Sequence, residues 1–221
     1  MDDLTLPRPL PEKRVFLGSY VRLEPLHTDH TADLWEAAQS ADASFTYLRY
    51  GPFPSIDAMR ATVDELSRRA YQPFWAVRDE ASGRVGGWLS LCDISPTDGA
   101  IEVGSIWISP VLQRTRQSTE AIFLLMQYAM DDLAYRRLVW RCCSKNIASM
   151  RAARRYGFIP EGIWRRAIVV KGQPMDIAWY SILEDEWDLR REAIKAWLKF
   201  DNFGPDGAAL RALSTNEERA A

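Results

Sequence analysis

Histidine and cysteine are scarce in this chain of 221 residues. A zinc site or a Ser-His-Asp triad would have to use His27 or His30, and their place in the chain favours a polar helix start instead. The three cysteines are Cys92, Cys142 and Cys143, with no C-x-x-C pair among them. We therefore expect neither a metal site nor a disulfide scaffold.

Long apolar runs and an excess of positive charge are missing too. The longest apolar stretches are far too short to span a membrane. The formal net charge is −2 and the sequence pI is about 5.8, which argues against non-specific binding to nucleic acid. The first fourteen residues, MDDLTLPRPLPEKR, contain no apolar signal core. These features predict a cytoplasmic protein with no membrane and no nucleic-acid partner.

What the chain does contain is a regular alternation of predicted elements. Hydrophobic residues make up 47% of it, enough for a sizeable core. The apolar periodicity predicts the order β-α-α-β-β-β-α-β-α-β-β-α. Expected strands cover residues 20–26, 74–78, 84–92, 101–108, 138–143, 164–170 and 175–182, and expected helices cover 28–40, 55–71, 147–156 and 184–200, with another from about 118. An α/β fold with a mixed sheet and helices on both faces fits this order.

Residues 101–162 are the most informative segment. An apolar strand runs into a polar, basic turn, and the turn opens onto a long amphipathic helix. Backbone N–H groups at a helix N-terminus are unpaired and lie at the positive end of the helix dipole. With arginines beside them, such groups form a site for phosphate. The segment therefore predicts a ligand that carries phosphate.

Four short motifs follow one another in the second half of the chain. They are Glu-Val-Gly-x-Ile-Trp at 102–107, Thr-Glu-Ala at 119–121, Asn-x-x-Ser at 146–149 and Gly-Phe-x-x-Glu-Gly at 157–162. Their order and the element order resemble the GNAT acetyltransferases, specifically the ribosomal-protein-alanine acetyltransferase-like branch. The resemblance implies the GNAT fold, with a central twisted mixed sheet, over residues 15–187. An extended arm over 1–14 and a helix and tail over 188–221 are expected to flank that domain.

The same resemblance implies an N-acetyltransferase. Such an enzyme moves the acetyl group of acetyl-coenzyme A, a co-substrate, to a primary amine of a small molecule or a peptide N-terminus by direct attack in a ternary complex. No metal is expected. Residues expected to bind the coenzyme are Ile106, Trp107, Ile108, Gln113, Arg114, Thr115, Arg116, Gln117, Ser118, Thr119, Asn146 and Ser149.

The expected pyrophosphate loop departs from the family pattern Q/R-x-x-G-x-G/A. Arg116 and Ser118 occupy both glycine positions, although Ser118 is small and can cap the helix. Either the backbone of Arg116 still fits and its guanidinium adds charge to the site, or coenzyme binding is weakened. We favour added charge because Arg114 is present too. The plainer alternative is that both arginines are solvated surface charges.

Two residues at the start of the helix at 147–156 are candidates for catalysis. By resemblance, Asn146 binds the pantetheine arm and Ser149 protonates the leaving sulfur; otherwise both residues cap the helix. Many relatives use a tyrosine four residues before the glycine of Gly-Phe, but Ala153 stands there. Tyr156 is out of register and is interpreted as packing, which makes Ser149 the better candidate for the acid.

The base is less sharply indicated. Glu102 is a lone acid in an apolar strand, and it is either the base or a carboxylate hydrogen-bonded for structure. Asp93 and Asp176 are weaker candidates, and an amine that arrives neutral needs no base.

The acceptor pocket is expected at the aromatic segment 45–53. Tyr47, Tyr50 and Phe53 are its candidate walls, although each of these aromatic residues is at least as typical of a core. The C-terminal helix carries Trp187, Ile194 and Trp197, which pack either on the protein's own core or on a partner in a homodimer. Two alternatives to acetyl transfer stay open: a non-catalytic sensor of acyl-coenzyme A, and transfer of a longer acyl group.

Overall fold

The computed structural model describes residues 5–215, which form two compact units. Of the described residues, unit 1 contains 5–8, 95–102 and 127–215, and unit 2 contains 9–94 and 103–126. Every helix within residues 5–215 is too short or too polar for a membrane span. The expected domain boundaries at residues 15 and 187 stay a prediction, and residues 1–4 of the expected arm and 216–221 of the tail lie outside the described part.

Eight strands form a mixed sheet with the hydrogen-bonded order β1-β2-β3-β4-β5-β6-β8-β7. β5 and β6 are parallel, whereas β2 and β3, β6 and β8, and β7 and β8 are antiparallel. This confirms the expected mixed sheet. The strands are β1 (Phe16–Leu17), β2 (Val21–Pro25), β3 (Phe74–Asp79), β4 (Val85–Ser95), β5 (Ala100–Ile108), β6 (Arg137–Cys143), β7 (Ile159–Val170) and β8 (Gln173–Leu183).

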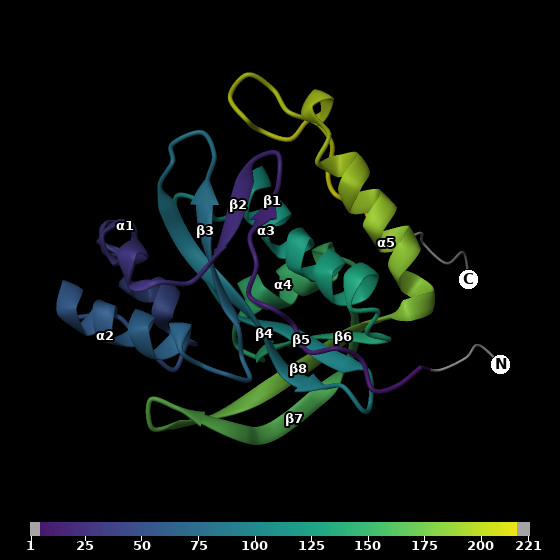
Figure 1. The fold of residues 1–221 in the computed structure, drawn as a ribbon, viewed down its shortest axis with the longest axis horizontal. Coiled ribbons are helices and arrows are strands. Elements are labelled where there is room, and N and C mark those ends of the chain that lie inside the picture. Colours follow the sequence, from purple (N-terminus) through teal and green to yellow (C-terminus); the bar gives the residue numbers. More distant parts are fainter. Residues whose placement is uncertain (1–4, 216–221) are drawn as a thin grey trace. The chain divides into compact units, whose positions relative to one another are not determined.

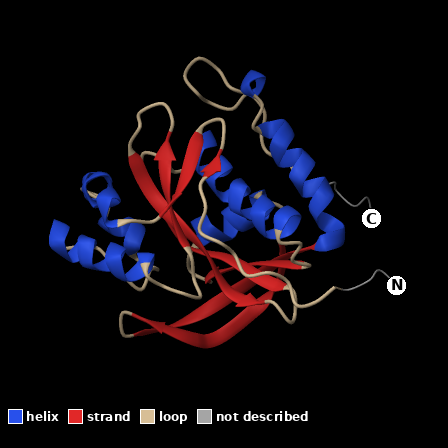
Figure 2. Cartoon of the chain, in the orientation of Figure 1, coloured by secondary structure: helices blue, strands red, loops and turns tan. Residues whose placement is uncertain are grey.

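The described residues contain five α-helices, which are blue in Figure 2. They are α1 (Thr31–Ala37), α2 (Ile56–Ser67), α3 (Arg116–Gln127), α4 (Ile147–Arg155) and α5 (Glu184–Trp197). The helix expected from residue 28 instead begins as a 3-10 turn, Thr28–His30, with His27 as its cap. α5 ends three residues before the expected end at Phe200.

Unit 2 is built around a core of aliphatic and aromatic side chains from α1, α2, β3, β4 and β5. Met59, Val63 and Leu66 recur at helical spacing along α2 and are fully buried. The hydroxyl oxygen of Ser55 accepts from the Ala58 N–H at 3.2 Å, which makes Ser55 the cap of α2. Figure 1 shows α1 and α2 side by side.

Unit 1 contains the long hairpin of β7 and β8 (Figure 1). Val170 pairs with Gln173, and the two residues between them, Lys171 and Gly172, have φ angles of 48° and 76°. Two successive positive φ angles are typical of the type I′ turn that closes tight hairpins. β7 begins five residues earlier than expected. The sequence pattern missed its first part because register shifts within 160–162 and 164–168 break the alternation of period two that marks a strand.

The apolar side of α5 also lies in unit 1. Trp187, Ile194 and Trp197 are 3%, 0% and 8% exposed. Of the two expected alternatives, the structure therefore supports packing within the chain itself. The homodimer stays a prediction.

A buried histidine beside a carboxylate is expected to make stability depend on pH. His30 Nε2 lies 3.0 Å from a Glu24 oxygen, and its Nδ1 accepts from the His27 backbone N–H at 3.1 Å. The ring is therefore neutral, with its proton on Nε2. Burial lowers the pKa of His30 below its ordinary value of 6.5, although the hydrogen bond to Glu24 opposes this.

We expect the free energy of unfolding to fall as the pH drops below 6.5. The unfolded chain takes up the histidine proton more readily than the folded chain does, so acid favours unfolding. His30→Gln keeps a donor and an acceptor but cannot titrate, and urea unfolding between about pH 5 and 7 should show a weaker pH dependence in this variant. The hydrogen bond from Arg78 lowers the pKa of Glu24 from 4.5, so that group's contribution is lost only at lower pH. An unchanged pH dependence in His30→Gln would contradict the prediction.

Candidate functional site

The N-terminus of α3, in unit 2, begins two residues earlier than expected. Thr115 Oγ1 accepts from the Ser118 N–H at 3.3 Å, which makes Thr115 the cap. Ser118 is not the cap, because its hydroxyl donates back to the Thr115 carbonyl at 3.0 Å. Arg116, Gln117 and Ser118 thus form the first turn of the helix, where N–H groups and the helix dipole favour an anion.

The two replaced glycine positions adopt conformations that any residue can take. The left-handed residue of the loop is Arg114, with φ of 64°, whereas neither Arg116 nor Ser118 has a positive φ. The Arg116 guanidinium lies 4.5 Å from the centre of the Tyr20 ring, and Arg116 is half-buried. Arg116 is therefore not a solvated surface charge, whereas Arg114 is exposed.

The expected coenzyme-binding strand, β5, has an irregular backbone at Ser105. Its φ of 50° is unusual for a residue with a side chain and marks local strain. Gln72 Nε2 donates to Ser105 Oγ at 2.8 Å, and the Tyr50 hydroxyl donates to the Ser105 carbonyl at 3.1 Å. Trp88 Nε1 donates to Tyr50 in turn at 3.0 Å, and burial raises the pKa of Tyr50. Hydrogen bonds from two loop residues thus hold Ser105, one at its backbone carbonyl and one at its side chain.

The remaining aromatic residues of segment 45–53 are largely packed. Phe45 is 1% exposed and stacks on Trp107 at a centroid distance of 4.9 Å, and Phe53 meets Phe45 edge-on at 5.4 Å. Tyr50 and Phe53 pack against the core of unit 2, and Tyr47 is half-buried. These contacts favour the core interpretation, and a role in the acceptor pocket stays a prediction.

Hydrogen bonds from side chains to backbone carbonyls connect the end of β5, the following loop and the start of α3. Trp107 is 1% exposed, whereas Ile106 is half-buried. The Ile108 carbonyl accepts from Gln113 Nε2 at 2.9 Å. The Thr119 hydroxyl is buried and donates to the Thr115 carbonyl at 3.0 Å. The side chains of Gln113 and Thr119 therefore have partners within this loop.

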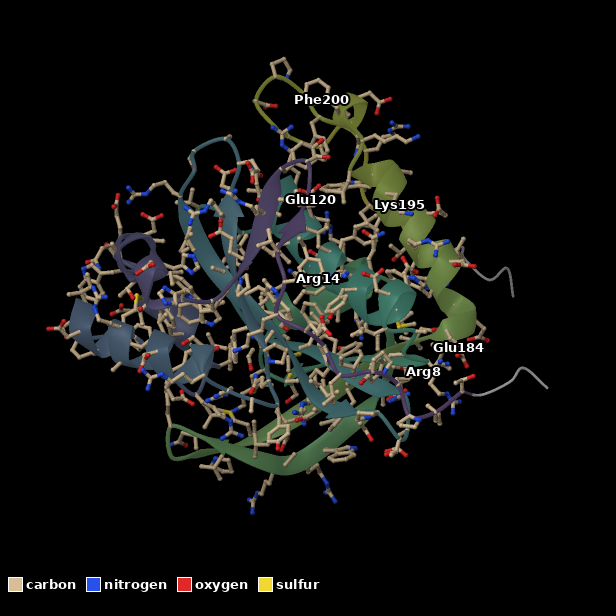
Figure 3. The ribbon with its side chains drawn as sticks, in the orientation of Figure 1. Arg8, Arg14, Glu120, Glu184, Lys195 and Phe200 are labelled. Carbon is tan, nitrogen blue, oxygen red and sulfur yellow. The ribbon has the colours of Figure 1, made fainter. Side chains whose placement is uncertain are left out.

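Glu120, labelled in Figure 3, has a role that the sequence did not reveal. Its carboxylate is buried on α3 and accepts three backbone N–H groups, from Ser19, Tyr20 and Val21, at 2.8, 2.6 and 2.8 Å. A Cβ on Gly18 would lie 2.4 Å from the Glu120 carboxylate, so the turn closes on it only with glycine. The signal in the sequence that could have revealed this role is an acidic residue among the apolar, buried positions of a helix.

Unit 1 holds the expected acid. Asn146 Oδ1 accepts from the Ser149 N–H at 3.1 Å, so Asn146 caps α4. Ser149 Oγ accepts from Trp140 Nε1 at 3.0 Å. Burial raises the pKa of the Cys142 thiol, and a hydrogen bond from Ser149 acts in the opposite direction. The structure thus brings Asn146 and Ser149 together and adds Trp140 and Cys142 from β6.

The candidate bases make contacts that suit structural roles. Glu102 is 4% exposed, and one carboxylate oxygen lies 2.5 Å from Arg141 Nε. Asp176 accepts from the Arg166 backbone N–H at 2.7 Å. Asp93 is exposed and has a positive φ of 42°. The ion pair with Arg141 offsets the buried charge of Glu102 without any catalytic role.

The end of α4 has a backbone cap and a packed tyrosine. Gly157, with φ of 91°, donates to the Arg154 carbonyl, and Phe158 donates to that of Ala153, which together end α4 in a Schellman motif. Tyr156 is 3% exposed and stacks on Trp140, in agreement with its interpretation as packing.

Across residues 5–215, His, Cys, Asp and Glu side chains form no group of three or more that would hold a metal ion.

Comparison with known proteins identifies the family. The model of the acetyltransferase (GNAT) domain matches residues 21–159. A GCN5-related N-acetyltransferase from Brucella melitensis is 42% identical, with a TM-score of 0.92 over 95% of this chain and 96% of that one. A probable GNAT acetyltransferase from Chromobacterium violaceum is 36% identical, with a TM-score of 0.78 over 85% and 94% of the two chains.

A relative from Bacillus subtilis agrees with the expected branch. YdaF, provisionally named a ribosomal N-acetyltransferase, is 27% identical over 168 residues, which are 75% of this chain and 91% of YdaF. The domain match, the close structural relatives and the confirmed fold lead to one conclusion: this chain is an acetyltransferase of the GNAT family.

Proposed function

We propose that this acetyltransferase moves the acetyl group of acetyl-coenzyme A to a primary amine of a small molecule or a peptide N-terminus. The amine attacks the thioester directly while both substrates are bound. The observation that carries this proposal is the capped start of α4, where a serine hydroxyl is held by a hydrogen bond from a buried indole. The provisional name of YdaF supports a peptide or protein acceptor over a small molecule.

The N-terminus of α3 and the loop before it are the proposed binding site for the coenzyme pyrophosphate. The positive end of the α3 dipole and the exposed Arg114 offer charge and hydrogen bonds to an anion, while the Ser118 N–H is bonded to Thr115. The backbone of β5 from Ile106 to Ile108 is the proposed partner of the pantetheine arm. These residues fit a phosphate-bearing ligand without a glycine in the loop, because the helical conformation of Arg116 and Ser118 leaves the first-turn N–H groups in place.

Ser149 is the proposed general acid. As the carbon–sulfur bond breaks, its hydroxyl gives a proton to the leaving sulfur. The proton that the amine nitrogen loses on forming the amide replaces it, so no net proton is consumed. Glu102 stays a predicted base. Because its carboxylate is paired with Arg141, we favour a reaction in which the amine arrives neutral and needs no base.

The direct test incubates the purified protein with acetyl-coenzyme A and a panel of amines and peptides, and measures free thiol. Acceptor-dependent thiol release supports the proposal. Acetyl-coenzyme A binding without such release would favour the sensor. A faster reaction with longer acyl donors would show that acetyl is not the preferred group.

Arg116→Gly tests the departure from the family loop. The residue contacts Tyr20 and occupies the first helical position, so glycine would lose both the ring contact and helix stability. We expect the dissociation constant of coenzyme A, measured by calorimetry, to stay equal or to rise. A clear gain in affinity would show that the arginine hinders binding.

A further inference from the structure

We propose that Trp140 is a positioning residue that holds the Ser149 hydroxyl with its proton directed to the leaving sulfur. This inference rests on the proposed role of Ser149 as the acid. It assigns a function to a side chain of β6 whose burial alone would suggest only a core residue.

The contact is one hydrogen bond in a well-packed place. Trp140 Nε1 lies 3.0 Å from Ser149 Oγ. The indole is 5% exposed, stacks on Tyr156 at a centroid distance of 6.0 Å and meets Phe158 edge-on at 5.6 Å. These rings restrict the indole, so its N–H has a fixed direction. Asn146 restricts Ser149 from the other side by capping its backbone N–H at 3.1 Å.

The direction of the serine proton follows from the chemistry of the two groups. An indole N–H can only donate, so the serine oxygen is the acceptor in this bond. The serine must therefore point its own proton elsewhere. A hydroxyl with one lone pair taken by a fixed donor is confined to few rotamers, and one with no such donor is not. Trp140 thus removes orientations in which the proton would be unavailable to the substrate.

A neighbouring sulfur supports this direction. Trp140 and Cys142 are two residues apart on β6 and so lie on the same face of the strand. Ser149 lowers the pKa of the Cys142 thiol, against the effect of burial, so the serine side chain lies close to this sulfur. The space beside the serine hydroxyl can therefore hold a sulfur atom, and the leaving group of the thioester is a sulfur too.

The test is a double-mutant cycle on turnover. Trp140→Phe removes the N–H and keeps an aromatic ring, and we expect it to lower kcat about tenfold, with the KM for acetyl-coenzyme A changed less than twofold. If Trp140 acts through Ser149, the same change made in the Ser149→Ala background should have almost no further effect on kcat. An equal tenfold loss in both backgrounds would overturn the proposal, because the indole would then act independently of the serine.

Two controls separate positioning from packing. Trp187 of α5 is only 3% exposed and donates its own indole N–H to Asp131. Trp187→Phe should therefore lower stability without lowering kcat. If Trp140→Phe fails to fold, 3-benzothienyl-alanine incorporated at position 140 keeps the indole shape with sulfur in place of N–H. Full activity of that variant would overturn the proposal.

The failure of each idea gives a different result. Wild-type kcat in Ser149→Ala refutes the proposed acid itself. A large loss in Ser149→Ala with no loss in either Trp140 variant refutes only the positioning role.

Discussion

Replacing Ser149 by alanine should lower kcat by about 100-fold, the lower end of what a positioned general acid contributes. The leaving thiolate would then take its proton from solvent. The affinity for acetyl-coenzyme A should change little, because the hydroxyl acts on a charge that develops only during the reaction. Steady-state kinetics with calorimetric binding of coenzyme A measure both quantities.

Ser149→Thr is the matched control for this prediction. Threonine keeps the hydroxyl that accepts from Trp140, so most of the lost activity should return. Ser149→Ala also leaves the buried Trp140 N–H without its partner, which should cost about 1–3 kcal/mol of stability. Kinetics must therefore be measured well below the unfolding temperature of each variant. A threonine variant as slow as the alanine variant would show that the hydroxyl is not the group that matters.

Glu120→Ala should lower the free energy of unfolding by about 3 kcal/mol or more. One carboxylate satisfies three backbone N–H groups in the turn between β1 and β2. Val21 is fully buried, so its N–H cannot turn to water when the carboxylate is removed. Urea unfolding followed by circular dichroism measures the loss.

Glu120→Gln is the control that separates charge from hydrogen bonding. Tyr20 and Val21 share one carboxylate oxygen, which the amide oxygen can replace, whereas Ser19 would face an amide N–H. We expect the glutamine variant to unfold between the wild type and the alanine variant. Equal stability of the wild type and Glu120→Ala would refute the anchoring role of the carboxylate.

The core elements of the fold could be predicted from the sequence because their patterns are local. The face of α2 formed by Met59, Val63 and Leu66 and its cap at Ser55 follow from helical spacing alone. β7 was less predictable, since its bulges break the alternation that marks a strand. β1 is two residues long and has no periodicity that could reveal it.

The candidate site was predictable where one segment supplies both partners, as in the Asn146 cap next to Ser149. Contacts between distant segments were not. Glu120 lies 99 to 101 residues from its backbone donors, and Tyr50 reaches Ser105 across 55 residues. The start of α3 was misplaced for another reason. Thr115 and Ser118 both suit a helix cap, and only the folded backbone shows that Thr115 takes that role.

The central claim is that this chain transfers an acetyl group to an amine. To measure this transfer directly, the purified protein is incubated with an acceptor peptide and acetyl-coenzyme A that carries a deuterated acetyl group. Mass spectrometry then measures the label on the peptide, and thiol titration measures the free coenzyme released. We expect one labelled acetyl group on the acceptor nitrogen for each free thiol released, and a much slower formation of both products in Ser149→Ala. Tight binding of acetyl-coenzyme A with no label on any amine or peptide tested would contradict it.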